Sequence, residues 1–162
     1  MPVHPWPHLL KRLKKGLVVL GLDVGSTTIG IAISDPDFRQ ATPLTTLARK
    51  KTSEDLKTLA TLCREREVGG FVIGLPLHMN GDMSDSARKA QQFAKAMQDH
   101  AALFGRNPEI SFFDERLTTA AAERFLIREA DVTRKRRDEV IDKLAAQMIL
   151  QAALDQYNNQ KP

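Results

Sequence analysis

The strongest constraint on the fold comes from residues 17–34, whose sequence is LVVLGLDVGSTTIGIAIS. Residues 17–22 are apolar throughout apart from Gly21, as in a strand that is buried on both faces. A second apolar run covers residues 29–33, and two such runs across a short glycine-containing turn predict a β-hairpin. The first strand ends in Asp23, whose carboxylate is costly to bury unless it is paired or binds a cation. An aspartate that caps its own turn explains this residue equally well on its own.

The elements that follow the hairpin predict an α/β domain. A helix that starts at Ser53 as its N-cap and continues to about Arg66 precedes a compact buried strand over residues 70–74. Because strand, helix and strand follow in that order, we expect a crossover with a parallel strand pair. The other expected elements are an edge strand beginning at 42–44, a helix capped by Ser84, a strand over 110–113, and helices over 120–127 and 138–157.

The length and the ends of the chain indicate one folded unit with two short extensions. At 162 residues the chain is long enough for one core, which we place in residues 17–157. Residues 1–16 hold three early prolines and a basic run, and we expect a flexible basic extension there. Residues 158–162 are polar and are expected to fray. The single cysteine, Cys63, excludes an intramolecular disulfide framework and a thiolate metal cage.

Charge and hydropathy bear on the partners of the chain. With 24 Lys and Arg against 20 Asp and Glu, the formal net charge is +4, which favours a nucleic-acid partner only weakly. No apolar run approaches the length that spans a membrane, so we expect a cytoplasmic protein without a membrane partner.

Three acidic positions are unusual for their surroundings. Asp23 and the pair Asp114–Glu115 each follow an apolar strand at the point where it leaves the sheet, where α/β proteins gather ligands. Asp142 lies on the apolar face of the last helix, three, four and seven residues before Ala145, Ala146 and Ile149. There it needs a positive partner, unless it only interacts with the helix dipole in the first turn.

Carboxylates converging from two strand ends and a helix would repel one another. Hard oxygen ligands suit Mg²⁺ or Mn²⁺, which would relieve that repulsion. Two such ions can activate water and stabilise the leaving oxygen of a phosphodiester. The four histidines, His4, His8, His78 and His100, show no zinc-binding spacing.

Four segments resemble the YqgF/RuvX family in order and spacing: LGLDVGSTTIGIAIS, VIGLPLHMNGDMSDSA, FFDERLTT and RRDEVIDKLAAQMILQAALD. The resemblance covers about residues 17–156 and implies an α/β, RNase H-like fold, with a central mixed sheet and helices on both faces. Members are regarded as nucleases or Holliday junction resolvases. The resemblance implies Asp23, Glu115 and Asp142 as the catalytic, metal-binding acids, with Glu115 preferred over Asp114 because its longer side chain can reach a shared metal. The neighbours expected to support this set are Asp114, Arg116 and Thr118.

One position departs from the family pattern. The family usually has a basic residue before the Ile-Gly of its first motif, where this chain has Thr28. The change removes a fixed cation near the acids or the substrate phosphate, so either a neighbour such as Arg116 compensates or activity is weakened.

The expected nucleic-acid contacts come from three segments. A basic cluster precedes the helix that carries Asp142, and it suits phosphate contact as well as it suits an ordinary solvated loop. The loop over residues 75–82 leaves a strand end on the expected active face, although a plain connection is an equal alternative. The candidate contact residues are Thr27, Thr28, His78, Asn80, Arg134, Lys135, Arg136 and Arg137.

These features favour a metal-dependent endonuclease, and the resemblance implies 5′-end processing of pre-16S rRNA in ribosome biogenesis. The first alternative is a Holliday junction resolvase in DNA recombination and repair, which would require a homodimer to place two cuts. The second alternative is a non-catalytic RNA- or ribosome-binding factor. A nucleotide binder of the actin-like ATPase type is a more distant alternative, because its Asp-x-Gly phosphate motif occurs only once in this chain.

Overall fold

A computed structural model describes residues 3–105, 109–118 and 134–160, and for Leu117 and residues 134–141 it describes the helical backbone without the side chains. Five strands form one sheet in the order β3-β2-β1-β4-β5. They are β1 (Val18–Val24), β2 (Thr28–Ser34), β3 (Ala41–Ala48), β4 (Val68–Leu75) and β5 (Glu109–Asp114). Strands β1, β2 and β3 pair antiparallel, whereas β1, β4 and β5 pair parallel. The predicted hairpin, crossover pair and mixed sheet are therefore confirmed.

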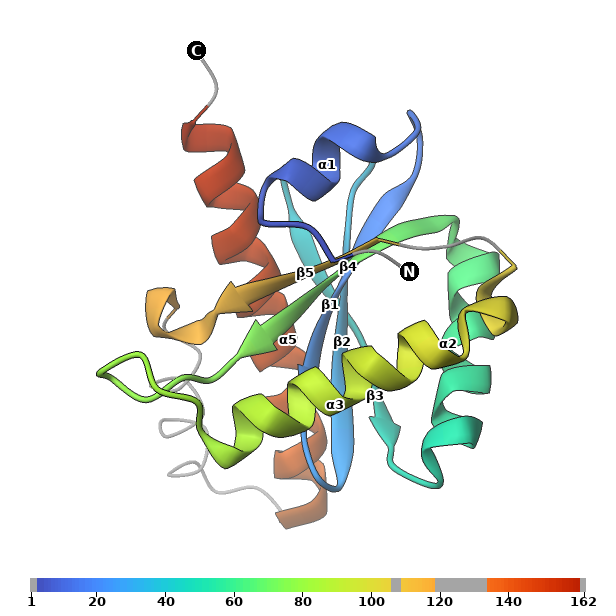
Figure 1. Cartoon of the computed structure of the whole chain (residues 1–162), viewed down its shortest axis with the longest axis vertical. Helices are drawn as coiled ribbons and strands as arrows, with labels where there is room; N and C mark the ends of the chain where they lie inside the picture. The colour runs from blue at the N-terminus through green and yellow to red at the C-terminus, as the bar shows by residue number, and fades with distance from the viewer. Residues whose placement is uncertain (1–2, 106–108, 119–133, 161–162) are drawn as a thin grey trace.

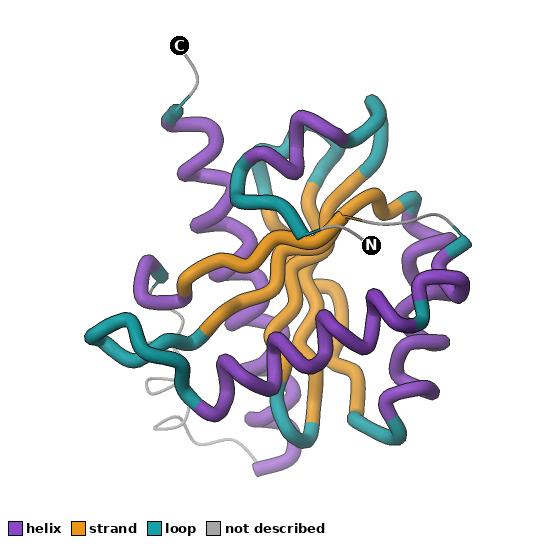
Figure 2. Tube along the Cα trace, in the orientation of Figure 1, coloured by secondary structure: helices purple, strands orange, loops and turns teal. Residues whose placement is uncertain are grey.

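Helices cover both faces of this sheet, as Figures 1 and 2 show. The helices α2 (Thr52–Arg66) and α3 (Asp85–Asp99) pack on one face, and α5 (Arg134–Asn159) packs on the other. Short elements complete the described chain: α1 (His8–Arg12) and the 3₁₀ helices η1 (Ala101–Phe104) and η2 (Glu115–Leu117). No described helix has the length and apolar character needed to cross a membrane.

The period of two along each strand divides the apolar side chains between two cores. Leu20, Leu22 and Ile73 belong to the core under α2 and α3. Val19, Val72 and their neighbours of the same parity belong to the core under α5. Both faces of β1 and β4 are thus buried, which explains their nearly continuous apolar sequences.

Several element boundaries differ from the sequence prediction. Helix α2 begins at Thr52 and Ser53 lies inside it, because the carbonyl of Lys51 already accepts a helical hydrogen bond from the N–H of Asp55 at 3.0 Å. Helix α5 includes Arg134–Arg137, since Lys and Arg are good helix formers. It continues to Asn159, and the Asn158 amide donates to the carbonyl of Phe38 at 2.9 Å. The helix expected over residues 120–127 lies outside the described residues.

The expected flexible arm over residues 1–16 is wrong for its described part. Leu9 and Leu10 are 0% and 5% exposed and belong to the core under α5. The Trp6 indole N–H donates to the carbonyl of Ala153 at 2.8 Å, and Arg12 Nε lies 2.9 Å from a Glu109 carboxylate oxygen. The leucine spacing of a short amphipathic helix, and not the prolines and basic residues around it, determines the behaviour of this segment.

We expect the substitution Leu9→Ala to lower the free energy of unfolding by about 2–4 kcal/mol, because it removes fully buried methyl groups and leaves a cavity. Urea denaturation followed by circular dichroism measures this loss. Val3→Ala is the matched control at a side chain that is 45% exposed, and it should change stability by about 0.5 kcal/mol or less. Equal stability of the two variants would contradict the docked position of the segment.

Candidate active site

The sheet face under α5 carries Asp23. Strand alternation gives Val19, Gly21 and Asp23 of β1 the same side of the sheet. A methyl group at Gly21 would meet Leu150 Cβ at 2.7 Å, which fixes this side as the one that α5 covers. Asp23 is half-buried and pairs with Gly30 of β2. Directly paired residues point to the same face, so the Asp23 side chain lies beside the strip where α5 crosses β2.

Helix α5 brings Asp142 to the same strip. A methyl group at Gly30 would overlap the backbone carbonyl of Asp142, so only glycine allows the helix to approach this closely. The Thr28 hydroxyl, two residues before Gly30, donates a hydrogen bond to a carboxylate oxygen of Asp142. Thr28, where the family pattern has a basic residue, therefore holds a candidate acid by a hydrogen bond from an uncharged hydroxyl.

Glu115 is the acid of the Asp114–Glu115 pair that lies under α5. It is half-buried at the start of η2, and a methyl group at Gly74 of β4 would meet its Cγ and Cδ at 3.3 Å. The same methyl group would meet Ile149 Cδ1 at 2.7 Å. Since Ile149 follows Asp142 by two helical turns, Glu115 and Asp142 lie along the same face of α5.

Asp114 has a different set of contacts. Its carboxylate accepts from the Arg116 backbone N–H at 2.9 Å and from Arg116 Nη2 at 2.6 Å. The hydrogen bonds and charge of the Arg116 guanidinium hold the pKa of the Asp114 carboxyl below its usual value. Thr118 closes the next turn, since its N–H and hydroxyl both donate to the carbonyl of Glu115. These contacts fix the backbone from which Glu115 projects.

We expect Arg116→Ala to raise the pKa of Asp114 toward its ordinary value, because the substitution removes the guanidinium that stabilises the carboxylate. The lowered pKa contributes stability that is present above the ordinary value of 3.8 and is lost as the pH falls below it. The variant should therefore be less stable than wild type near neutral pH, and this difference in stability should disappear in acid. Carboxyl NMR titration measures the pKa. Arg88→Ala, which removes the exposed partner of Asp85, is the control and should leave Asp114 unchanged.

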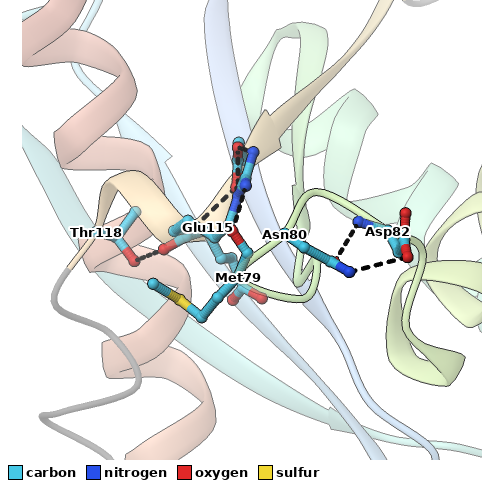
Figure 3. A network of polar contacts seen from close by, with 7 residues as sticks. Met79, Asn80, Asp82, Glu115 and Thr118 are labelled. Atoms are coloured by element: carbon cyan, nitrogen blue, oxygen red, sulfur yellow. Dashed lines mark hydrogen bonds and ion pairs between the residues drawn. The ribbon is translucent and has the colours of Figure 1, made fainter.

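The loop that follows β4 is tied to the Asp114–Thr118 segment. Arg116 Nη1 donates to the carbonyl of Met79 at 3.1 Å, and Figure 3 shows the loop with Met79, Asn80 and Asp82. The Asn80 side chain closes the loop on itself, because its amide donates to the Asp82 carboxylate and its oxygen accepts from the Asp82 N–H, both at 3.0 Å. His78 is exposed, and its carbonyl accepts from the N–H of Gly81 at 2.8 Å. The loop thus lies beside the acids, and Asn80 supports its shape.

The other candidate contact residues are divided between two regions. Thr27 is exposed in the hairpin turn, next to Thr28. The second region is the first turn of α5, five to eight residues before Asp142, which holds Arg134, Lys135, Arg136 and Arg137. Their side chains lie outside the described part of the structure.

The donor set fits a hard divalent cation in its chemistry. Asp23, Glu115 and Asp142 supply carboxylate oxygens from β1, η2 and α5, and all three are half-buried on the α5 side. Among the described side chains, no three His, Cys, Asp or Glu are grouped closely enough to hold a metal ion. The acids therefore share a face without forming a closed cage, and Thr28 already holds one of them.

Sequence reasoning missed the residue that supports the hairpin turn. Arg49 donates from its backbone N–H to the carbonyl of Thr27 and from Nη1 to the carbonyl of Gly25, both at 2.9 Å. Its Nε lies 3.0 Å from a carboxylate oxygen of Asp55, whose side chain is 2% exposed. Asp55 could have been interpreted from the sequence only as a helix-dipole partner, because nothing local shows that it is buried.

Comparison with known proteins gives close relatives over almost the whole chain. Residues 17–156 match the family described as "RuvX: Holliday junction resolvase". A protein of Gluconobacter oxydans, named "Putative pre-16S rRNA nuclease", is 41% identical over 96% of this chain and 95% of its own length. A Rhodospirillum rubrum protein of the same name is 41% identical over 100% of this chain and 98% of its own.

The fold also resembles a solved structure. A Thermus thermophilus RuvC in complex with a Holliday junction substrate covers 90% of this chain and 99% of its own, with a TM-score of 0.53 and 14% sequence identity. At this identity the likeness concerns the fold alone, and it confirms the predicted RNase H-like arrangement of a mixed sheet with helices on both faces.

Proposed function

We propose that this chain, which belongs to the RuvX family, is a divalent-metal-dependent endonuclease that hydrolyses phosphodiester bonds of nucleic acid. The observation that carries the proposal is the placement of three carboxylates on one face of the sheet. Asp23, Glu115 and Asp142 come from separate elements and border the strip where α5 crosses the sheet. Half-buried carboxylates along one strip are costly for folding unless they are paired or bind cations.

The residues of the site fall into two groups in the proposed reaction, the acids that would bind cations and the residues that position those acids. Asp23, Glu115 and Asp142 would hold Mg²⁺ or Mn²⁺ through carboxylate oxygens. The bound cations would supply activated water and stabilisation of the leaving oxygen. Thr28 orients Asp142 by its hydrogen bond, and the Arg116–Asp114 pair and Thr118 fix the turn that carries Glu115.

The names of the relatives favour an RNA substrate. Proteins that are 41% identical along nearly their full lengths carry the name of a pre-16S rRNA nuclease. We therefore propose 5′-end processing of pre-16S rRNA in the cytoplasm as the role of this chain.

The second candidate substrate is a four-way DNA junction. The description of the family as Holliday junction resolvases favours it. This function would require a homodimer, since two symmetric cuts need two active sites.

Cleavage of two substrates offered side by side tests the proposal. Labelled pre-16S 5′-leader RNA and a four-way DNA junction are incubated with the purified protein in Mg²⁺, Mn²⁺ or EDTA. We expect metal-dependent cleavage of the RNA at defined positions and none in EDTA. Cleavage of the junction alone would favour the resolvase. Tight binding without any cleavage would contradict the nuclease and favour a non-catalytic RNA-binding factor.

A further inference from the structure

A pocket of about 310 Å³ opens beside the hairpin turn, where β1 and β2 meet the connection from β3 to α2 and the exposed side of α3. Eight residues line it, and six of them are polar or positively charged: Ser26, Arg49, Lys50, Thr52, Lys89 and Gln92. None of the eight carries a carboxylate. The pocket therefore presents hydrogen-bond donors and positive charge to whatever enters it.

Arg49 gives the pocket a fixed wall. Its guanidinium lies 5.3 Å from the ring centroid of Phe93, forms an ion pair with Asp55 and donates a hydrogen bond to the carbonyl of Gly25. Asp55 balances the charge of Arg49, and the guanidinium covers the aromatic ring. The pocket consequently offers no aromatic face on which a base could stack.

Lys50 and Lys89 supply charge that no described carboxylate balances. Both side chains are exposed, and within the described ranges neither lysine forms an ion pair. Other cations of α3 differ, because Arg88 pairs with Asp85 at 3.0 Å and Lys95 pairs with Asp99 at 2.9 Å. Two unbalanced lysines with the hydroxyls of Ser26 and Thr52 suit a singly charged phosphate diester.

The hairpin turn connects this pocket to the candidate acids. Ser26 lines the pocket three residues after Asp23 and two residues before Thr28, which bonds Asp142. Arg49 holds the same turn through the carbonyls of Gly25 and Thr27. A nucleic-acid strand bound at the acids on one side of the turn can thus reach the hydrogen-bond donors of the pocket on the other side.

We propose that this pocket binds a backbone phosphate of the nucleic-acid strand, on the flank of the phosphate that is cleaved. This inference rests on the proposed nuclease function for its substrate. Because the contacts go to phosphate and none to a base, the pocket contributes affinity and strand position without sequence preference. Lys50 and Lys89 are binding residues in this account, and the carboxylates remain the catalytic ones.

Salt-dependent binding tests the proposal. Labelled single-stranded RNA is titrated at several salt concentrations with protein that carries Asp23→Asn, a substitution that we expect to prevent cleavage. Adding Lys50→Gln and Lys89→Gln together should weaken binding about tenfold near 100 mM salt, and should reduce the slope of log affinity against log salt by about 0.7 per lysine, the value for single strands. A variant with Arg at both positions should restore binding.

Lys57→Gln with Arg66→Gln is the matched control. Both residues are exposed on α2 and neither lines this pocket, and the two substitutions remove the same charge as the lysine pair does. Equal loss in the two double variants would overturn the proposal, since it would show a general charge effect. Displacement of the RNA by millimolar inorganic phosphate to the same extent in all variants would also overturn it.

The two proposals can fail separately. If wild-type protein cleaves RNA and the lysine variants bind as the control does, the phosphate pocket is wrong and the nuclease stands. If no substrate is cleaved but binding falls only in the lysine variants, the pocket stands and the nuclease is wrong.

Discussion

Asp23→Asn is expected to lower the cleavage rate by on the order of a thousandfold or more, because it removes one carboxylate charge from the proposed cation site. Asparagine has nearly the shape of aspartate, and position 23 is half-buried with an ordinary pairing to Gly30, so the fold should be retained. Nucleic-acid affinity should change by about threefold or less, since the basic surfaces are unaffected. Single-turnover cleavage and equilibrium binding measure the two effects on one preparation.

Asp37→Asn provides the matched control for this substitution. Asp37 is exposed in the turn that follows β2, so the variant loses the same charge away from the candidate acids. It should cleave at the wild-type rate. Cleavage by Asp23→Asn at a rate close to that of Asp37→Asn would remove Asp23 from the catalytic set.

Gly30→Ala should lower the free energy of unfolding by about 3 kcal/mol. The added methyl group overlaps the backbone carbonyl of Asp142, so α5 must move away from the sheet. The same movement separates Asp142 from Thr28 and from the strand that carries Asp23. Activity should therefore fall even at temperatures at which the variant remains folded.

Gly69→Ala separates crowding of a backbone from crowding of flexible side chains. The three atoms nearest to a methyl group there belong to the side chains of Leu13 and Leu17, with Leu17 Cδ1 at 2.8 Å, and the ends of these side chains can move. We expect a loss of about 1 kcal/mol and retained activity. Thermal unfolding and cleavage assays on both variants test the difference, and equal losses would contradict the close approach of α5 to β2.

The sheet and the positions of the acids were accessible from the sequence because strands and helices have short periods. The apolar runs of β1 and β4 predict burial on both faces, and the observed parallel pairing confirms the crossover. The period of two also places Asp23 on one face, as the close packing of Leu150 over Gly21 now shows. The assignment of Asp23, Glu115 and Asp142 to a metal stays a prediction.

The missed features depend on contacts between distant parts of the chain. The basic residues of segment 1–16 predicted an extension, whereas Leu9 finds a place in the core only once β4 and α5 are assembled. The Arg49–Asp55 ion pair joins residues that are close in the sequence. Its structural role depends on the distant hairpin turn, where Arg49 donates to the carbonyl of Gly25. The pocket that we propose for phosphate brings together Ser26, Lys50 and Lys89, which no sequence motif links.

The most direct test of the central claim is calorimetric titration of the wild-type protein with Mn²⁺, compared with Asp23→Asn, Glu115→Gln and Asp142→Asn. We expect saturable Mn²⁺ binding by wild type and an affinity at least about tenfold weaker in each variant, because each variant loses one ligand charge from a shared site. Asp114→Asn should bind Mn²⁺ nearly as wild type does, since the Asp114 carboxylate already accepts a hydrogen bond from Arg116 Nη2. Undiminished Mn²⁺ affinity in all three variants would contradict the claim that these carboxylates form a metal site.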